Sequence, residues 1–389
     1  MSVQYIDQTL FEGIASRISY ENLVLMAGLL QSLPITLMDV PLEQAGKYPL
    51  AQVLSQEMLR AVIQPTVAQI HSAYRLGFRK VVLLYHQQPG MAVSPELELS
   101  FGRLQQLAMA FSLKVENAST LQVKEIEDLC KQLAGVPVDT FIYSDSSSML
   151  EPFSTYERLQ QVQRFIPFTL EFHGHNAHGL ATANTLSAIR AGVQYVATAI
   201  AGVGDAGHAP FEEVVMAAKH LLGASQTIVS SSIAPTCTAI MRCFGKVVAV
   251  DKAIIGPNIF AHESGLHVDG VVKNPKIYEP FSPEEVGLSR YLVIGKHSGS
   301  TSLQVVLRDL GVELDDIAAQ RLLKLVRTTV VNKKSFLSPL EVLQLGHIGE
   351  EIDGKDRECS IGRYYSAGRR TSCRGSIFNR GKSKHCTGS

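Results

Sequence analysis

The sequence has no long hydrophobic run, few cysteines and no net charge, and each shortage excludes a class of protein. No apolar stretch reaches the roughly 18 residues that a membrane span requires. The six cysteines show no CxxC spacing, so neither a zinc ribbon nor a disulfide framework is indicated. Residues 1–7 combine no basic segment with an apolar one, so no secretory signal is supported and we expect a cytoplasmic protein.

The zero net charge hides an uneven distribution along the chain. Residues 352–389 hold nine Lys or Arg and three Asp or Glu, so the remainder is acidic. This segment is rich in Gly, Ser and Arg and has little periodic apolar content, so we expect a disordered basic tail. Such a tail can bind nucleic acid, but no interleaved aromatic residues demand it, and an altered C-terminal sequence is the other interpretation. We therefore expect neither a nucleic-acid nor a membrane partner.

Short β-rich runs alternate with amphipathic stretches over the first 200 residues. Helical spacing of apolar residues is clear over residues 121–133 and 180–191. Strands that alternate with helices predict βαβ units and a parallel sheet. The eight predicted strands are residues 3–6, 35–40, 60–64, 80–85, 113–116, 139–143, 169–173 and 194–199.

The number of these units predicts an α/β fold of the (β/α)8 TIM-barrel type, in which the C-terminal ends of the strands carry the chemistry. Polar residues follow several of the predicted strands. Glu12 follows the first, Asp145 and Ser146 follow the sixth, and a Gly-rich turn over residues 202–208 follows the eighth. A doubly wound open sheet is the alternative, but it does not need eight units with converging polar ends.

The pattern divides the chain into three parts. We assign residues 1–225 to the barrel, residues 226–350 to a mainly helical appendage that closes over the barrel mouth, and residues 351–389 to the basic tail. Helical periodicity over residues 301–331, with Asp315 near a helix start, supports the appendage.

Two histidines stand two residues apart at the end of the seventh predicted strand. Side chains alternate between the faces of a strand, so His173 and His175 point in the same direction. Two neutral imidazoles that face one cavity can hold a divalent cation when a carboxylate joins them. A pair of hydrogen-bonded histidines at a strand end is the plain structural alternative.

Three motifs in order resemble those of one enzyme family. Residues 171–176 (EFHGHN), followed by residues 179–185 (GLATANT), are similar to the signature of the homocitrate, isopropylmalate and citramalate synthases. Residues 7–13 (DQTLFEG) resemble that family's opening motif, and residues 260–270 (FAHESGLHVDG) resemble its post-barrel motif. The segment 294–299 and the absence of a long regulatory domain look closest to the homocitrate synthases of nitrogen-fixing bacteria.

The resemblance implies a metal-dependent condensation of acetyl-CoA with a 2-oxo acid, with 2-oxoglutarate and homocitrate as the first choice. It maps the metal ligands of the catalytic site onto Glu12, His173 and His175, and manganese, magnesium, zinc and iron all suit such a set. His267 maps to the base that takes a proton from the methyl group of acetyl-CoA, a task suited to histidine. Without the resemblance, a surface histidine is the better interpretation of His267.

Other positions follow the resemblance less closely. Ser146 and Asn176 are the implied substrate-binding residues, although a serine in this run is otherwise an ordinary loop residue. His208 stands where the family has an asparagine near the metal, so it is either a further ligand or a loop histidine. Family members commonly pair so that the appendage covers the partner's site, which implies a homodimer here.

Several departures from the family pattern concern the active site. Phe11 replaces an arginine that stabilises the developing alkoxide, and the loss of such a donor costs orders of magnitude in rate. Ile14 and Ala15 replace a Glu-Gln pair, Ala177 replaces an acid, and the strand ending at His86 lacks an arginine for the distal carboxylate of 2-oxoglutarate. The alternatives are a catalytically degenerate paralogue that acts as a binding or partner subunit, and a related isopropylmalate synthase, citramalate synthase or acyl-CoA lyase.

Overall fold

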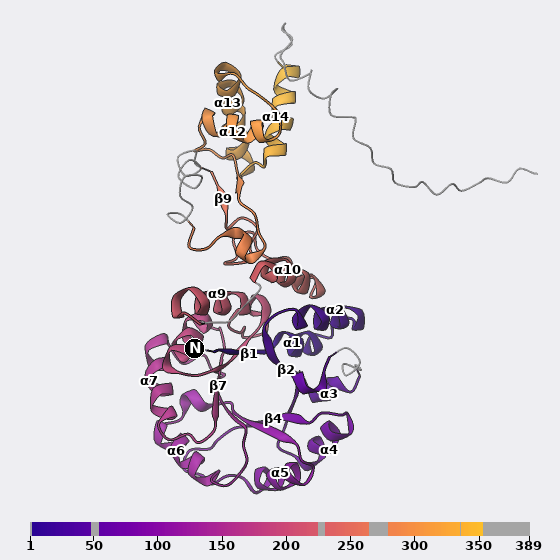
Figure 1. Ribbon diagram of the computed structural model, residues 1–389, viewed down its shortest axis with the longest axis vertical. Coiled ribbons are helices and arrows are strands. Elements are labelled where there is room, and N and C mark those ends of the chain that lie inside the picture. The colour runs from indigo at the N-terminus through magenta and orange to yellow at the C-terminus, as the bar shows by residue number, and fades with distance from the viewer. Residues whose placement is uncertain (1, 48–53, 225–229, 264–278, 335, 353–389) are drawn as a thin grey trace, which may run out of the picture. The chain divides into compact units, whose positions relative to one another are not determined.

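A closed barrel of eight parallel strands forms the first part of the computed structural model (Figure 1). The structure describes residues 2–47, 54–224, 230–263, 279–334 and 336–352. Each strand pairs with the next along the chain, and β1 pairs with β8 to close the ring. The strands are β1 (Gln4–Asp7), β2 (Ile35–Pro41), β3 (Leu59–Ile63), β4 (Lys80–Tyr85), β5 (Ala110–Val115), β6 (Thr140–Asp145), β7 (Thr169–Gly174) and β8 (Tyr195–Thr198).

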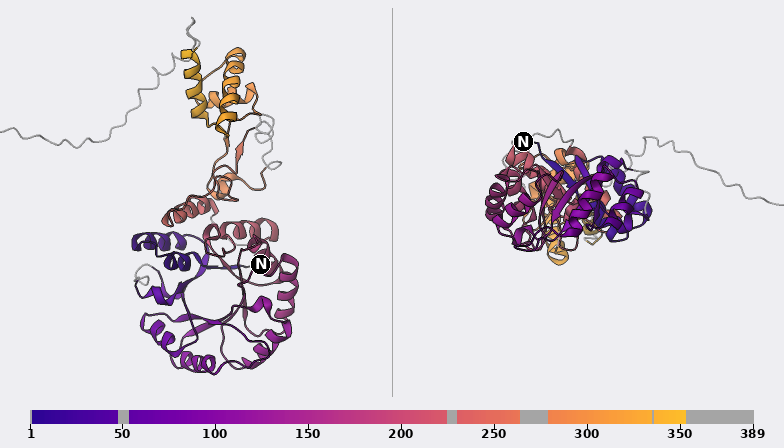
Figure 2. Two further views of the ribbon diagram at one scale, coloured as in Figure 1. Left: turned by 180° about the vertical axis from the view of Figure 1, so that it is seen from behind. Right: turned by 90° about the horizontal axis from the view of Figure 1, so that it is seen from below.

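Helices alternate with the strands and surround the barrel, as Figures 1 and 2 show. This arrangement confirms the predicted (β/α)8 fold. None of the helices in the described ranges is both long enough and apolar enough to cross a bilayer. The helices are α1 (Thr9–Ala15), α2 (Tyr20–Gln31), α3 (Leu42–Ala45), α4 (Val67–Arg75), α5 (Pro95–Gln106), α6 (Val123–Gln132), α7 (Pro152–Gln163), α8 (Ala181–Ala191), α9 (Phe211–Leu222) and α10 (Ile233–Cys243).

The chain divides into two compact units. The first comprises residues 1–260 and 281–289, and the second comprises residues 261–280 and 290–389. Helix α10 belongs to the first unit and packs against α2, where the Asn22 side-chain amide donates to the carbonyl of Cys243 at 3.2 Å. The domain boundaries predicted at residues 225 and 350 stay predictions.

The second unit has a hydrophobic core of its own, to which Leu303, Val326 and Val330 contribute. The Asp315 carboxylate caps helix α13 (Asp316–Lys333) by accepting a hydrogen bond from the Ala318 backbone N–H at 2.7 Å, which confirms the predicted helix start. The described elements of this unit are β9 (Ala261–His262), β10 (Tyr291–Leu292), α12 (Ser300–Asp309), α13 (Asp316–Lys333) and α14 (Pro339–Ile352).

Two helices, α12 and α13, form the helical pattern predicted over residues 301–331. Gly311 follows the first of them with a φ of 80°, a left-handed conformation that glycine adopts without strain. The predicted basic tail falls almost wholly on residues 353–389, which lie outside the described residues.

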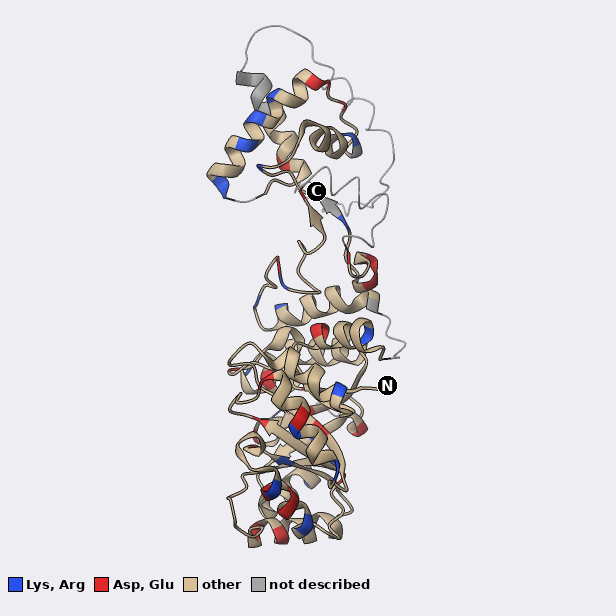
Figure 3. Ribbon diagram, turned by 90° about the vertical axis from the view of Figure 1, so that its left-hand side faces the viewer, with Lys and Arg blue, Asp and Glu red and all other residues tan. Residues whose placement is uncertain are grey.

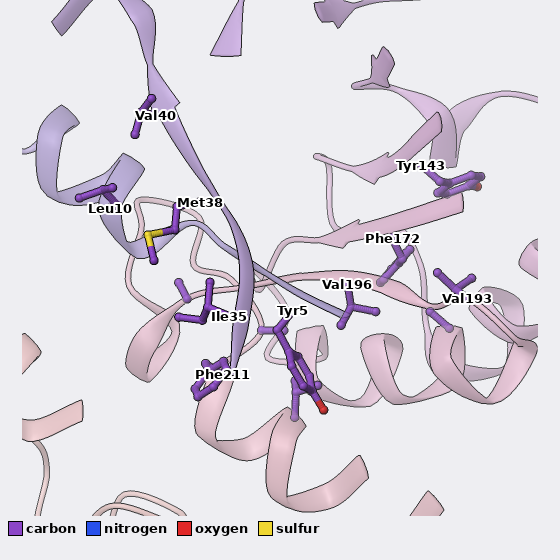
Figure 4. Close-up of a cluster of buried hydrophobic side chains, with 14 of the residues drawn as sticks. Tyr5, Leu10, Ile35, Met38, Val40, Tyr143, Phe172, Val193, Val196 and Phe211 are labelled. Carbon is purple, nitrogen blue, oxygen red and sulfur yellow. The ribbon is translucent and has the colours of Figure 1, made fainter. Parts of the chain in front are cut away.

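Apolar side chains fill the space between the strands and the helices of the barrel. The rings of Tyr5 and Phe211 meet edge to face at 5.6 Å between centroids (Figure 4). Met38 and Val40 of β2 also belong to this buried cluster. Because side chains alternate along a strand, Asp39 between them faces the interior of the barrel.

Buried charged residues lie on the barrel strands. Figure 3 marks where the acidic and basic residues fall along the ribbon. Arg60 Nε lies 2.7 Å from Asp39 Oδ1, and Arg60 Nη1 lies 2.8 Å from Glu171 Oε2. Arg60 Nη2 donates to the other oxygen of each carboxylate at 3.0 and 3.2 Å. All three residues are at most 3% exposed. One guanidinium therefore joins β2, β3 and β7 across the barrel.

We expect Arg60→Met to lower the free energy of unfolding by about 3–5 kcal/mol, because two buried carboxylates lose their cation. Urea denaturation followed by far-UV circular dichroism measures this loss. Arg190→Met on the exposed face of α8 is the matched control, and we expect it to change stability by no more than about 0.5 kcal/mol. Equal midpoints for the two variants would show that the barrel does not depend on this cation.

Candidate metal centre

The two histidines of the predicted pair face the same way in the structure. Leu170 and Phe172 of β7 belong to the core between strands and helices, so Glu171 and His173 face the interior of the barrel. The ring of His175 lies 4.9 Å from that of His173 and nearly parallel to it, at 8°. The predicted common direction of these two side chains is confirmed.

His208 from the turn after β8 completes a cluster of three histidines. Its backbone forms an antiparallel bridge with that of His175, and its Nδ1 lies 3.2 Å from His173 Nε2. One ring nitrogen from each of the three side chains lies within 4.8 Å of the other two. These three side chains could hold one metal ion.

Glu12 reaches the cluster through His208. It lies on α1, directly after β1, and its Oε1 is 3.1 Å from His208 Nε2. The carboxylate therefore contacts the ring nitrogen opposite the one that faces His173. A carboxylate in this position orients a ligand histidine and fixes its tautomer. In the described residues Glu12 is not a member of the close group, and its predicted role as a direct ligand stays a prediction.

Glycines give His208 and Glu12 the space they occupy. A Cβ on Gly204 would lie 2.9 Å from His208 Cδ2 and 3.2 Å from Glu12 Oε1. The φ of Gly204 is 136°, a value that residues with a side chain rarely adopt. The Gly-rich turn is therefore a requirement of this site.

His173 and His175 are held in the neutral form that binds metals. Burial lowers the pKa of His175 to about 4, and it lowers the pKa of His173 well below the ordinary value of 6.5. After burial, the positive charge of Lys114 is the largest cause of the lowered pKa of His173. The Nδ1 atom of His175 is buried and has no hydrogen-bond partner in the described structure. Three imidazoles with an unused nitrogen and a nearby carboxylate fit a divalent transition metal.

The other predicted site residues are placed as follows. Ser146 is exposed, and its Oγ lies 2.9 Å from Ser144 Oγ. Asn176 Oδ1 accepts a hydrogen bond from the Ala181 backbone N–H at 3.0 Å, so this oxygen holds the start of α8. The substrate-binding roles of Ser146 and Asn176 stay predictions. His267 lies outside the described residues.

Two residues beside the cluster were not predicted from the sequence. Ser144 is fully buried on β6 and pairs in register with His173. Lys114 of β5 lowers the pKa values of both His173 and His175. Ser144 could have been found from the alternation of side chains along the strand next to Asp145. Lys114 could have been found because it is a lysine within a predicted barrel strand.

Two family descriptions match successive parts of the chain. Residues 93–239 match the HMGL-like family, and residues 254–334 match the family described as homocitrate synthase post-HMGL domain-like. The chain carries both regions, in that order. The HMGL-like match includes β5 to β8 and the histidine cluster, whereas Glu12 precedes it.

Two relatives share substantial identity with part of the chain. The homocitrate synthase of Frankia alni is 39% identical over 204 residues, which cover 52% of this chain and 58% of that protein. The 2-isopropylmalate synthase 2 of Caldanaerobacter subterraneus subsp. tengcongensis is 37% identical over 235 residues, which cover 60% of this chain and 61% of that protein. The chain therefore spans less than two thirds of the length of these relatives.

A solved structure shares the fold of the barrel unit. The HMG-CoA lyase of Bacillus subtilis aligns with a TM-score of 0.53 and 13% sequence identity, over 64% of this chain and 95% of that one. At this identity the likeness supports the barrel fold alone.

We expect the protein to bind a divalent ion through the three histidines. Mn²⁺ at 100 times its Kd should raise the free energy of unfolding by about 2.7 kcal/mol, and His173→Ala should abolish this gain. Urea denaturation with and without Mn²⁺ and elemental analysis after gel filtration measure the two effects. His71→Ala on α4, where His71 contacts Arg103 at 2.6 Å, is the control and should retain the ion. Wild-type metal content in His173→Ala would contradict the assignment.

The metal-free protein should lose stability as the pH falls from 6.5 towards 4. The pKa of His175 is about 4 in the folded chain against an ordinary 6.5, so the unfolded chain binds more protons in this window. The slope contributed by one such group is at most roughly 1.4 kcal/mol per pH unit. Urea denaturation in EDTA at pH 7 and pH 5 should show a smaller loss for His175→Gln than for the wild type. Equal losses would mean that His175 is not buried in its neutral form.

Proposed function

We propose that this protein catalyses a metal-dependent condensation of acetyl-CoA with a 2-oxo acid. The observation that carries the proposal is the cluster of His173, His175 and His208 at the C-terminal end of the barrel strands, where TIM barrels hold their chemistry. The HMGL-like and homocitrate synthase post-HMGL matches support the same reaction class. The relatives named homocitrate synthase and 2-isopropylmalate synthase support it as well.

Each residue of the cluster has a task in this proposal. A divalent metal would supply a Lewis acid for the ketone oxygen of the 2-oxo acid. His173, His175 and His208 would hold that ion as neutral imidazoles, and Glu12 would orient the ring of His208. The Ser144 hydroxyl, buried on the strand next to His173, would donate to a substrate oxygen.

The reaction also needs a base for acetyl-CoA and the hydrolysis of a thioester. We propose His267 as the base that removes a proton from the methyl group of acetyl-CoA. The resulting carbanion attacks the ketone carbon, and hydrolysis of the thioester then releases CoA and makes the reaction irreversible. The finer assignment that we propose is 2-oxoglutarate as substrate and homocitrate as product, in a cytoplasmic homodimer of the nitrogen-fixation type.

Phe11 favours a second candidate function. It is partly exposed on α1, one residue before Glu12, and it brings no charge to the site. An alkoxide that lacks one stabilising donor typically forms about 10²–10³ times more slowly. A protein that keeps the barrel and the metal centre, but serves as a binding or partner subunit, fits this feature.

Thiol release distinguishes the two functions. With Mn²⁺, acetyl-CoA and 2-oxoglutarate, we expect the wild type to release CoA faster than Glu12→Ala, because Glu12 holds His208 in place. Phe11→Arg should raise kcat by a factor on the order of 100 if the other groups are intact. Phe336→Arg, at an exposed phenylalanine of the second unit, is the matched control and should leave kcat unchanged.

The choice of 2-oxo acid completes the assay. Pyruvate and 2-oxoisovalerate tested beside 2-oxoglutarate separate the citramalate and isopropylmalate reactions from the homocitrate reaction. Release no faster than that of Glu12→Ala with all three acids, in the wild type and in Phe11→Arg, would refute the enzymatic proposal and leave the binding subunit.

A further inference from the structure

Lys114 places an amine inside the barrel. Its neighbours Leu113 and Val115 belong to the core between strands and helices, so Lys114 faces the interior. Lys114 pairs in register with Ile142 of β6, and Ile142 pairs with Glu171 of β7. Strands lie about 4.8 Å apart, so the backbones of Lys114 and Glu171 stand about 10 Å apart at one level of the barrel.

The amine lies close to the histidine cluster. His173 is the next inward-facing residue after Glu171 on β7, towards the C-terminal end of the strand. The charge of Lys114 lowers the pKa of His173 more than the charges of His208 and His175 do. The side chain of Lys114 is enclosed over most of its surface but keeps a partly exposed portion. A small molecule bound at the cluster is therefore within reach of it.

Of the carboxylates that act on the pKa of Lys114, that of Glu116 has the largest effect, and those of Asp39 and Glu171 follow. Another cation binds Asp39 and Glu171. Arg60 donates to both oxygens of Asp39 and to both oxygens of Glu171, and Gln8 Nε2 donates to Asp39 Oδ2 at 2.8 Å. These carboxylates act on Lys114 only at a distance.

No acceptor in the described structure serves the amine of Lys114. Neither a hydrogen bond nor an ion pair joins it to a residue in the described ranges. Its partners in register, Leu84 and Ile142, have apolar side chains that cannot accept a hydrogen bond. An ammonium with three donors and no acceptor is costly inside a protein, and burial accordingly lowers the pKa of Lys114.

We propose that Lys114 binds the second carboxylate of a dicarboxylic 2-oxo acid whose ketone end lies at the three-histidine cluster. The inference rests on the proposed function for the ketone end and adds the residue that would recognise the distal carboxylate. A carboxylate supplies the hydrogen-bond acceptors that no described residue offers to this amine, and it carries the charge that an ammonium attracts. A 2-oxo acid with an apolar side chain would leave the ammonium without an acceptor, so Lys114 would determine specificity.

Calorimetric titration of the Mn²⁺-loaded full chain tests this assignment without turnover. We expect the wild type to bind 2-oxoglutarate more tightly than 2-oxoisovalerate by a factor on the order of 10 to 100 in Kd, the range of a charge-assisted hydrogen bond. Lys114→Met should reduce this preference to about threefold or less, and Lys114→Arg, which keeps the charge, should preserve most of it.

Lys80→Met is the matched control, because Lys80 also lies on a barrel strand but donates to the backbone carbonyl of Glu57. It should keep the wild-type preference. Far-UV circular dichroism checks the fold of each variant, and Lys114→Gln replaces Lys114→Met if the latter does not fold. The preference should fall in Lys114→Gln as well, because the charge is lost.

Two results would overturn the assignment. Equal affinity of the wild type for the two acids, including no binding of either, would remove it. An unchanged preference in Lys114→Met would make Lys114 a structural counter-charge for Glu116, Asp39 and Glu171. Selective binding without thiol release refutes the proposed reaction and leaves this inference standing, whereas thiol release with unselective binding does the reverse.

Discussion

The bidentate contacts of Arg60 with Asp39 and Glu171 are the interaction on which the rest of the structure depends. They neutralise two carboxylates that the barrel has removed from water, and they tie three strands together at their inward faces. Glu171 is fixed by these contacts, and His173 follows it on the same face of β7. A charged group beneath the histidine cluster thus sets the position of the strand that carries the first histidine.

Local sequence pattern predicted the barrel because each strand and helix has its own periodicity. All eight strands were predicted, and β4 was predicted with the bounds that the structure shows. Strand β5 begins three residues earlier than predicted, at Ala110, because Lys80 of β4 pairs with it in register. Pairing between strands, which a single segment does not encode, sets this boundary. Gly311 divides the helical pattern near residue 310, where apolar spacing alone continues.

Local pattern alone predicted the candidate site only where its residues are neighbours in sequence, whereas Glu12 and His208 were named from the family resemblance. His173 and His175 lie on one strand end, so alternation along the strand was enough to place them together. The contact of Glu12 with His208 joins residues 196 positions apart, and that of Arg60 with Glu171 joins residues 111 positions apart. Such contacts depend on strand order and register around the ring, and no periodicity in the sequence specifies them.

The contact between Glu12 and His208 links the segment after the first strand to the segment after the last. These two segments meet only because β1 and β8 are hydrogen-bonded to each other, which is the final pairing that turns an open sheet into a ring. The centre therefore cannot assemble in a partly synthesised chain or in half a barrel. A correctly formed centre therefore reports that the ring of strands has closed.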